Sequence, residues 1–228
     1  MWCNHAGGWK LWLISAAATL CFGCAIPQTF STLQHHSITL KPYDLEKHGL
    51  AFITPSTVTG QEEEKQAVSL AFSDVFQKKR PEIPLMRLPQ TLSAVNRAGI
   101  EEDYAHMFVD YRDTGMFKLN SLQNVQKATG MRYLGQLKLS GFKQDSDGRL
   151  SILGLRVLST KIARLRLFFQ IWDASDGSIA WEGLDELEYA EDTAAERTVT
   201  LQKAVNKAAN DLINLLPSGS QPDKEAIK

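Results

Sequence analysis

Apolar and polar residues alternate with a period of two through much of the second half of the chain. From Ile162 to Trp172, one side of the expected strand carries Arg164, Arg166 and Gln170. The other side is apolar and consists of Ala163, Leu165, Leu167, Phe169 and Ile171. A strand that buries one face and leaves the other in water has this pattern. The segment therefore predicts a half-buried strand with an arginine-bearing outer face.

Three further strands are expected beside this one. Residues 133–140 alternate in the same way, and residues 151–158 and 179–189 are also expected to be extended. The Asp-Ser-Asp-Gly run at residues 145–148 and the segment 173–177 have compositions typical of turns. Together these segments predict an antiparallel meander.

The first half of the body predicts a short strand followed by helices. Leu50–Ile53 is an apolar run that fits a buried first strand. Thr59 and Glu62 have the spacing of a capping box, and Pro81 follows a basic helix end, so that one helix is expected between them. Shorter helices are expected at residues 88–98, from residue 101 onward, and from residue 120 or 121 to residue 130.

A nearly continuous apolar stripe predicts a long helix near the C-terminus. Thr193 and Glu196 repeat the capping-box spacing, and Pro217 follows the stripe. The stripe consists of Leu201, Ala204, Val205, Ala208, Leu212, Leu215 and Leu216. Because this helix follows the strands, we expect it to pack on the sheet. The predicted fold class is α/β of the α+β type, with a mixed, largely antiparallel sheet and helices packed on it.

The start of the chain has the features of a signal peptide. Lys10 gives a short polar segment one positive charge, and the apolar run Leu11–Phe22 follows it. This run is shorter than the roughly 20 residues that span a bilayer. It ends at Gly23 and Cys24, where the sequence resembles the lipobox of bacterial lipoproteins, although Cys21 and the residue after it depart from the usual box.

The lipobox resemblance implies that the signal is cleaved before Cys24 and that this cysteine is acylated. Ala25, in place of Asp, implies sorting to the outer membrane, with the body facing the periplasm. The alternatives are ordinary cleavage nearby, with Cys24 lost or left as a free thiol, and a retained amino-terminal anchor. The expected organisation is a lipoprotein signal peptide at 1–23, a lipidated N-terminus and flexible tether at 24–46, a single periplasmic α/β domain at 47–217, and a polar tail at 218–228.

Composition argues against several functions. The chain has 25 basic and 26 acidic residues, so no bulk positive field attracts nucleic acid. Its three cysteines all lie within the first 24 residues, which excludes disulfide and cysteine–metal scaffolds from the body. The sequence has no nucleophile elbow, phosphate loop or zinc-binding histidine pair, and His48 and His106 are isolated. We therefore expect neither a cofactor nor a metal, and no enzymatic activity.

The order of elements, together with the W-D-x-x-x-G-x-x-x-W-E turn, resembles a group of periplasmic lipoproteins. The turn is carried by Trp172, Asp173, Gly177, Trp181 and Glu182. The group contains relatives of the curli secretion lipoprotein, the penicillin-binding-protein activator lipoproteins, and the amino-terminal domain of the Tol-Pal propeller protein. The resemblance implies a non-catalytic accessory domain that binds an envelope protein.

Candidate partner contacts lie on the arginine face: Arg164 and Arg166, joined by Arg156, could bind an acidic partner or a glycan. A solvated outer sheet face explains the same arginines. Two other functions stay open. A secretion-pore subunit needs strands of about 9 to 11 residues with a lipid-facing side, which only Ile162–Trp172 approaches. A hydrolase would need a site that forms only on folding.

Overall fold

The computed structural model describes residues 28–152, 155–193 and 199–218. For residues 147–152, 155–159 and 192–193 it describes only the course of the backbone. The strands are β1 (Gln28–Ser37), β2 (Leu50–Phe52), β3 (Ser56–Thr57), β4 (Leu85–Met86), β5 (Tyr133–Ile152), β6 (Leu155–Asp173) and β7 (Ile179–Thr193). The helices are α2 (Asp44–His48), α3 (Glu62–Lys79), α4 (Leu88–Ala98), α5 (Glu101–Thr114), α6 (Leu119–Thr129) and α7 (Leu201–Ile213).

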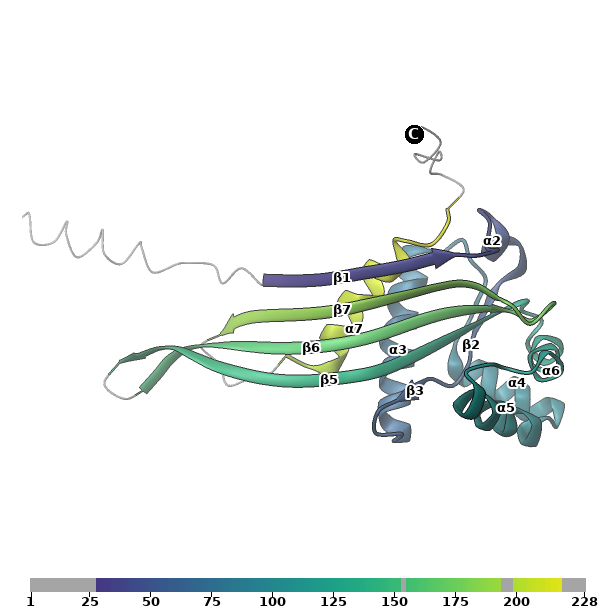
Figure 1. The fold of residues 1–228 in the computed structure, drawn as a ribbon, viewed down its shortest axis with the longest axis horizontal. Helices are drawn as coiled ribbons and strands as arrows, with labels where there is room; N and C mark the ends of the chain where they lie inside the picture. Colours follow the sequence, from purple (N-terminus) through teal and green to yellow (C-terminus); the bar gives the residue numbers. More distant parts are fainter. Residues whose placement is uncertain (1–27, 153–154, 194–198, 219–228) are drawn as a thin grey trace, which may run out of the picture.

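These strands form one seven-stranded sheet with the order β1–β7–β6–β5–β2–β4, and β3 also pairs with β5. Each of the four long strands is antiparallel to its neighbour in the order β1–β7–β6–β5, whereas β2 runs parallel to both β4 and β5. Figure 1 shows α3 and α7 against one face of the long strands and α4, α5 and α6 gathered at one end of the sheet. The predicted α+β class, with a largely antiparallel sheet and a C-terminal helix, is confirmed.

The main core lies between the sheet and the helices α3 and α7. Phe169 of β6 is fully buried, and its ring centroid lies 4.9 Å from Phe72 of α3 and 5.5 Å from Trp181 of β7. The predicted apolar side of β6 faces this core, and Ala204, Val205, Ala208 and Leu212 of α7 are buried against it. The apolar side of β6 and the apolar stripe of α7 therefore pack together in one core.

A second core cluster lies on the other face, where α4, α5 and α6 cover the end of the sheet. Trp172 packs against Phe117 at 5.0 Å between ring centroids. The hydroxyl of Tyr104 accepts a hydrogen bond from the Thr54 amide at 2.9 Å, and Phe108 and Tyr111 pack against the cluster. The aromatic residues of α5 thus belong to this core.

The expected flexible tether is wrong for the part that the structure describes. Residues 28–37 form β1, which pairs with β7 without a break in register, and residues 44–48 form α2. Nine of the ten β1 side chains are exposed and one is half-buried, so the strand has no apolar period that sequence reasoning could detect. Main-chain pairing with β7 holds it in place. Residues 1–27, including the expected signal peptide and Cys24, lie outside the described residues, as do residues 219–228 of the expected tail.

The predicted turn at residues 145–148 is also wrong, because these residues continue β5. They pair with residues 159–162 of β6, and the predicted strand at 151–158 is divided between the ends of these two strands. Strand lengths of 20 residues for β5, 19 for β6 and 15 for β7 remove the length argument against a pore subunit. Turn-like composition failed here because Asp145 is paired with Arg164 across the strands.

Two predicted helix starts are displaced. Gln61 precedes α3, and Thr59 donates its hydroxyl proton to Glu64 at 2.6 Å, so the Thr59–Glu62 capping box is absent. Thr193 belongs to β7, and α7 begins at Leu201, where the Thr200 hydroxyl accepts a hydrogen bond from the Lys203 amide. The spacing of a capping box was present by chance in both segments.

Close packing of β7 against α7 predicts a strong effect of a small substitution. A Cβ atom at Gly183 would lie 2.5 Å from the Trp181 ring and 3.0 Å from Leu212. We expect Gly183→Ala to lower the free energy of unfolding by about 1–3 kcal/mol, because the core must shift to admit the methyl group. Gly141→Ala in β5 meets nothing within 4 Å and should change stability by less than about 0.5 kcal/mol. Urea unfolding of both variants tests this, and equal effects would contradict it.

One buried carboxyl group joins β1 to β7. Asp185 is fully buried, and Ser31 of β1 donates a hydrogen bond to its Oδ1 at 2.5 Å. Its Oδ2 has no hydrogen-bond partner among the described residues. Burial raises the pKa of Asp185 from 3.8 to about 6, with nearby Asp211 adding to the rise, and Ser31 and Lys207 opposing it. The folded state therefore holds a proton that the unfolded chain releases.

This raised pKa predicts that stability falls as pH rises. Between about pH 4 and pH 6 the folded state binds more protons than the unfolded state, so the contribution of Asp185 should fall by about 2 kcal/mol across this interval and change little above it. Urea unfolding at several pH values should show that Asp185→Asn lacks this slope relative to wild type. Ser31→Ala, which retains the carboxyl group, should keep it. Parallel pH profiles for wild type and Asp185→Asn would contradict the assignment.

Candidate functional site

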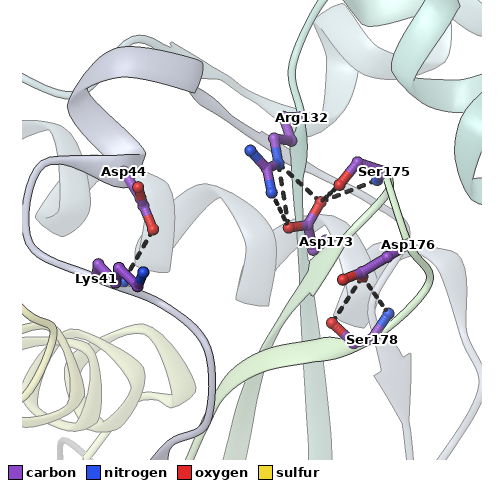
Figure 2. Close-up of polar contacts among 7 residues, drawn as sticks. All are labelled: Lys41, Asp44, Arg132, Asp173, Ser175, Asp176 and Ser178. Carbon is purple, nitrogen blue, oxygen red and sulfur yellow. Dashed lines mark hydrogen bonds and ion pairs between the residues drawn. The ribbon is translucent and has the colours of Figure 1, made fainter.

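The W-D-x-x-x-G turn between β6 and β7 is organised by its first aspartate (Figure 2). The Gly177 amide donates to the Asp173 carbonyl at 2.8 Å, and Gly177 has a φ of 80°, which an L side chain rarely adopts. Ser175 donates both its amide and its hydroxyl to Asp173 Oδ1, at 2.9 and 2.6 Å. Asp176 accepts the amide and hydroxyl of Ser178, at 2.9 and 2.7 Å. The polar residues of the turn therefore satisfy one another.

Arg132 fixes this turn to the start of β5. Its Nη2 lies 2.6 Å from Asp173 Oδ2, and its Nε lies 2.9 and 3.1 Å from the two carboxylate oxygens. Burial alone would raise the pKa of Asp173, but hydrogen bonds from Arg132 and Ser175 outweigh it and lower the pKa. The hydrogen bond from Arg132 to Asp173 also raises the pKa of Arg132. A carboxylate whose pKa is lowered in this way is a poor proton acceptor, so the cluster acts as a structural clamp.

Figure 2 also shows the segment that enters α2 on the same side of the molecule. The Lys41 amide donates to Asp44 Oδ2 at 2.9 Å, which closes the turn before α2. The turn residues that carried the resemblance to envelope lipoproteins thus hold together the ends of β5, β6 and β7. Their geometry accounts for the W-D-x-x-x-G pattern without a bound molecule.

A different surface is available for binding. We use the term open face for the surface of β1, β7 and β6 that lies opposite α3 and α7. Cross-strand register places its residues in three rows. The rows are Phe30–Glu188–Arg164, Thr32–Glu186–Arg166 and Gln34–Leu184–Phe168. All of these side chains are exposed or half-buried, so the open face is a solvent-accessible, slightly apolar surface crossed by charged pairs.

The two predicted partner contacts, Arg164 and Arg166, lie together on the open face. Arg164 donates to Glu188 at 2.7 Å and to Asp145 at 2.7 Å, and Arg166 pairs with Glu186. Each arginine side chain is about half exposed, so water screens these pairs and they contribute little to stability. The arginines therefore form an alternating charge pattern with their neighbours rather than a purely basic patch. Arg156 lies in β6 where only the backbone is described, and its side chain is not placed relative to this pair.

Two hollows accompany these surfaces. A hollow of about 160 Å³ lies on β1, β7 and β6. Its lining residues include His36, Phe168 and Leu184. A groove of about 630 Å³ lies between α3 and α4, with Leu70 and Leu92 among its lining residues.

The part of the chain that the structure describes has no group of three or more His, Cys, Asp or Glu residues that could hold a metal ion. It also has no helix long and apolar enough to cross a membrane.

Sequence reasoning missed the contribution of β1 to this surface. Phe30 is 66% exposed, although it belongs to a strand that is paired along its whole length. The only sequence signal was a run of ten residues without proline, glycine or a carboxylate, which permits a strand but does not require one.

Comparison with known proteins gives a coarse result. No protein-family model and no curated protein matches the chain. Similar solved structures include a PelC dodecamer from Paraburkholderia phytofirmans, with 9% identity, a TM-score of 0.47, and coverage of 83% of this chain and 99% of that one. The lipoprotein GNA1162 from Neisseria meningitidis has 9% identity, a TM-score of 0.38, and coverage of 73% and 96%. The LpoB C-terminal domain from Salmonella enterica has 12% identity, a TM-score of 0.32, and coverage of 60% and 80%.

At these identities and TM-scores the likeness is one of fold only, and nothing about the action of this chain follows from it. One of the three similar structures is that of a lipoprotein.

The clamp at the turn predicts different effects for two neighbouring aspartates. Asp173→Asn removes the charge that faces Arg132 and should lower the free energy of unfolding by about 2 kcal/mol at pH 7. Because the pKa of Asp173 is lowered by folding, this deficit should shrink as pH falls below about 4. Asp176→Asn keeps its acceptor oxygen in an exposed turn and should change stability by less than about 0.5 kcal/mol. Denaturant unfolding measures both, and a harmless Asp173→Asn would show that the clamp is not required.

Proposed function

We propose that the protein is a lipoprotein anchored in the outer membrane through an acylated Cys24, and that it acts in the periplasm as a non-catalytic accessory protein. It binds an envelope protein with the open face of its sheet. The anchor rests on the Gly23-Cys24 sequence at the end of an apolar run. The absence of cysteine from the body is compatible with an oxidising compartment.

The observation that carries the binding proposal is the exposure of β1. An antiparallel strand at the side of a core ordinarily buries one face, whereas nine of the ten β1 side chains are exposed. Phe30, Leu184 and Phe168 add apolar area to the open face, and the charged pairs beside them offer polar contacts. Exposed apolar area bordered by polar residues is typical of a surface that contacts another protein.

Site-specific crosslinking tests the surface. A photo-crosslinking amino acid at Thr32, on the open face, should capture one defined envelope protein in cells, whereas the same amino acid at Val109, exposed on α5, should not capture it. Mass spectrometry of the purified protein should show an acylated Cys24 as the first residue. Capture of the same protein with equal yield at Thr32 and Val109 would contradict the assignment to the open face.

Charge reversal locates the contact more closely. Arg164→Glu combined with Arg166→Glu should reduce the yield of the Thr32 crosslink at least about tenfold, the loss expected when about 1.4 kcal/mol of binding free energy is removed. The matched control is Arg97→Glu combined with Arg112→Glu, which makes the same charge change on exposed positions of α4 and α5. If both double variants have the same effect, the arginines of the open face are not part of the contact.

A further inference from the structure

Beside the three rows of the open face, a further row of polar residues lies on the same side of the sheet. Cross-strand register aligns its members on four neighbouring strands, as His36, Glu182, Gln170 and Gln136. Gln170 donates a hydrogen bond from its Nε2 to Glu182 Oε2 at 3.2 Å. Tyr111 of α5 donates its hydroxyl proton to Gln170 Oε1, also at 3.2 Å. A half-buried carboxylate therefore lies at the foot of α5, with an amide as its hydrogen-bond donor.

This carboxylate has no positive partner. Among the residues that the structure describes, Glu182 makes no ion pair, whereas Arg164 and Arg166 are each paired with a glutamate of β7. Lys138 lies on β5, which β6 separates from β7, and it does not pair with Glu182. Burial raises the pKa of Tyr111, and the charge of Glu182 adds to the rise. The negative charge at this position is thus left uncompensated within the described part of the chain.

The hollow of about 160 Å³ on β1, β7 and β6 lies beside this carboxylate, because Glu182 is one of its lining residues. Phe168 and Leu184 supply apolar lining, and Gln34 and His36 supply polar lining. A guanidinium group matches this combination of chemistry. Its N–H groups donate to a carboxylate in a fork, and its flat face packs on an aromatic ring. An ammonium group would satisfy the charge but would use the apolar lining less well.

Covering the open face removes water from Glu182. A carboxylate that loses water without gaining a positive partner is strongly destabilised. Because Arg164 and Arg166 are already paired, the compensating charge has to come from the protein that covers the face. Arginine is enriched at protein interfaces, whereas lysine is depleted there.

From this arrangement we infer that Glu182 and the hollow beside it receive an arginine side chain of the envelope partner. The guanidinium donates to the Glu182 carboxylate and packs against Phe168. The inference rests on the proposed function and names the chemistry that the open face recognises in its partner. The contact adds a positively charged anchor of the partner to the contacts made by Arg164 and Arg166.

Removal of the carboxylate charge tests the contact. Glu182→Gln keeps the size of the side chain, and it should reduce the yield of the Thr32 crosslink at least about tenfold, because the guanidinium loses its charged acceptor. Glu102→Gln makes the same change at an exposed position of α5 and should leave the yield unchanged. Equal yields from wild type and Glu182→Gln would overturn the inference and leave the proposed function standing. Absence of any crosslink from the wild type would overturn both.

Mapping of the crosslink tests the chemistry of the partner. A photo-crosslinking amino acid at Gln34, an exposed residue that lines the hollow, should attach next to an arginine in the captured protein, as read by tandem mass spectrometry. Glu182→Arg should abolish the Thr32 crosslink, and exchange of the mapped arginine for glutamate should restore about half of its yield or more, since the two changes are coupled. Attachment remote from any arginine, or no restoration by the exchanged charges, would contradict the inference.

Discussion

Burial of one face of β6 beneath α3 and α7 is the interaction on which the other features depend. Phe169 lies at its centre, in contact with Phe52, Phe72, Phe76 and Trp181. The helices α3 and α7 cover the apolar face of the sheet, so the open face on the opposite side can lie in solvent. The tight fit of Gly183 against Trp181 and Leu212 shows how closely the same layer holds β7. The strands β5 and β7 pair with β6 on either side, so both are attached to this buried layer.

The two ends of the long strands are built differently. At one end, Arg132 and Asp173 clamp the turn between β6 and β7, and α4, α5 and α6 cover the sheet. At the other end, the β5–β6 hairpin continues past the start of β1. The molecule therefore has a capped end and a projecting end. β1 begins at the projecting end.

Sequence reasoning was most successful for elements with one buried side, because their apolar residues recur at a regular spacing. The alternation of Ala163 to Ile171 and the stripe of α7 gave the correct elements and the correct core faces, because both are buried on one side only. The same reasoning failed for β1, since a strand exposed on both faces has no period, and for residues 145–148, where paired charges stabilise a strand of turn-like composition. The arginines of the open face were predictable as surface residues. Their partners Glu186 and Glu188 were not, because cross-strand register depends on the whole sheet.

The central claim is that residues 28–37 form a strand paired with β7, where the sequence predicted part of a flexible tether. Amide hydrogen exchange of residues 28–37 in the mature protein tests this claim most directly. Pairing of β1 with β7 predicts slow exchange for alternate amides of β1, those that donate to β7, and loss of this protection together with that of the adjoining part of β7. Uniform exchange of residues 28–37 at the rate of an unstructured peptide would contradict it.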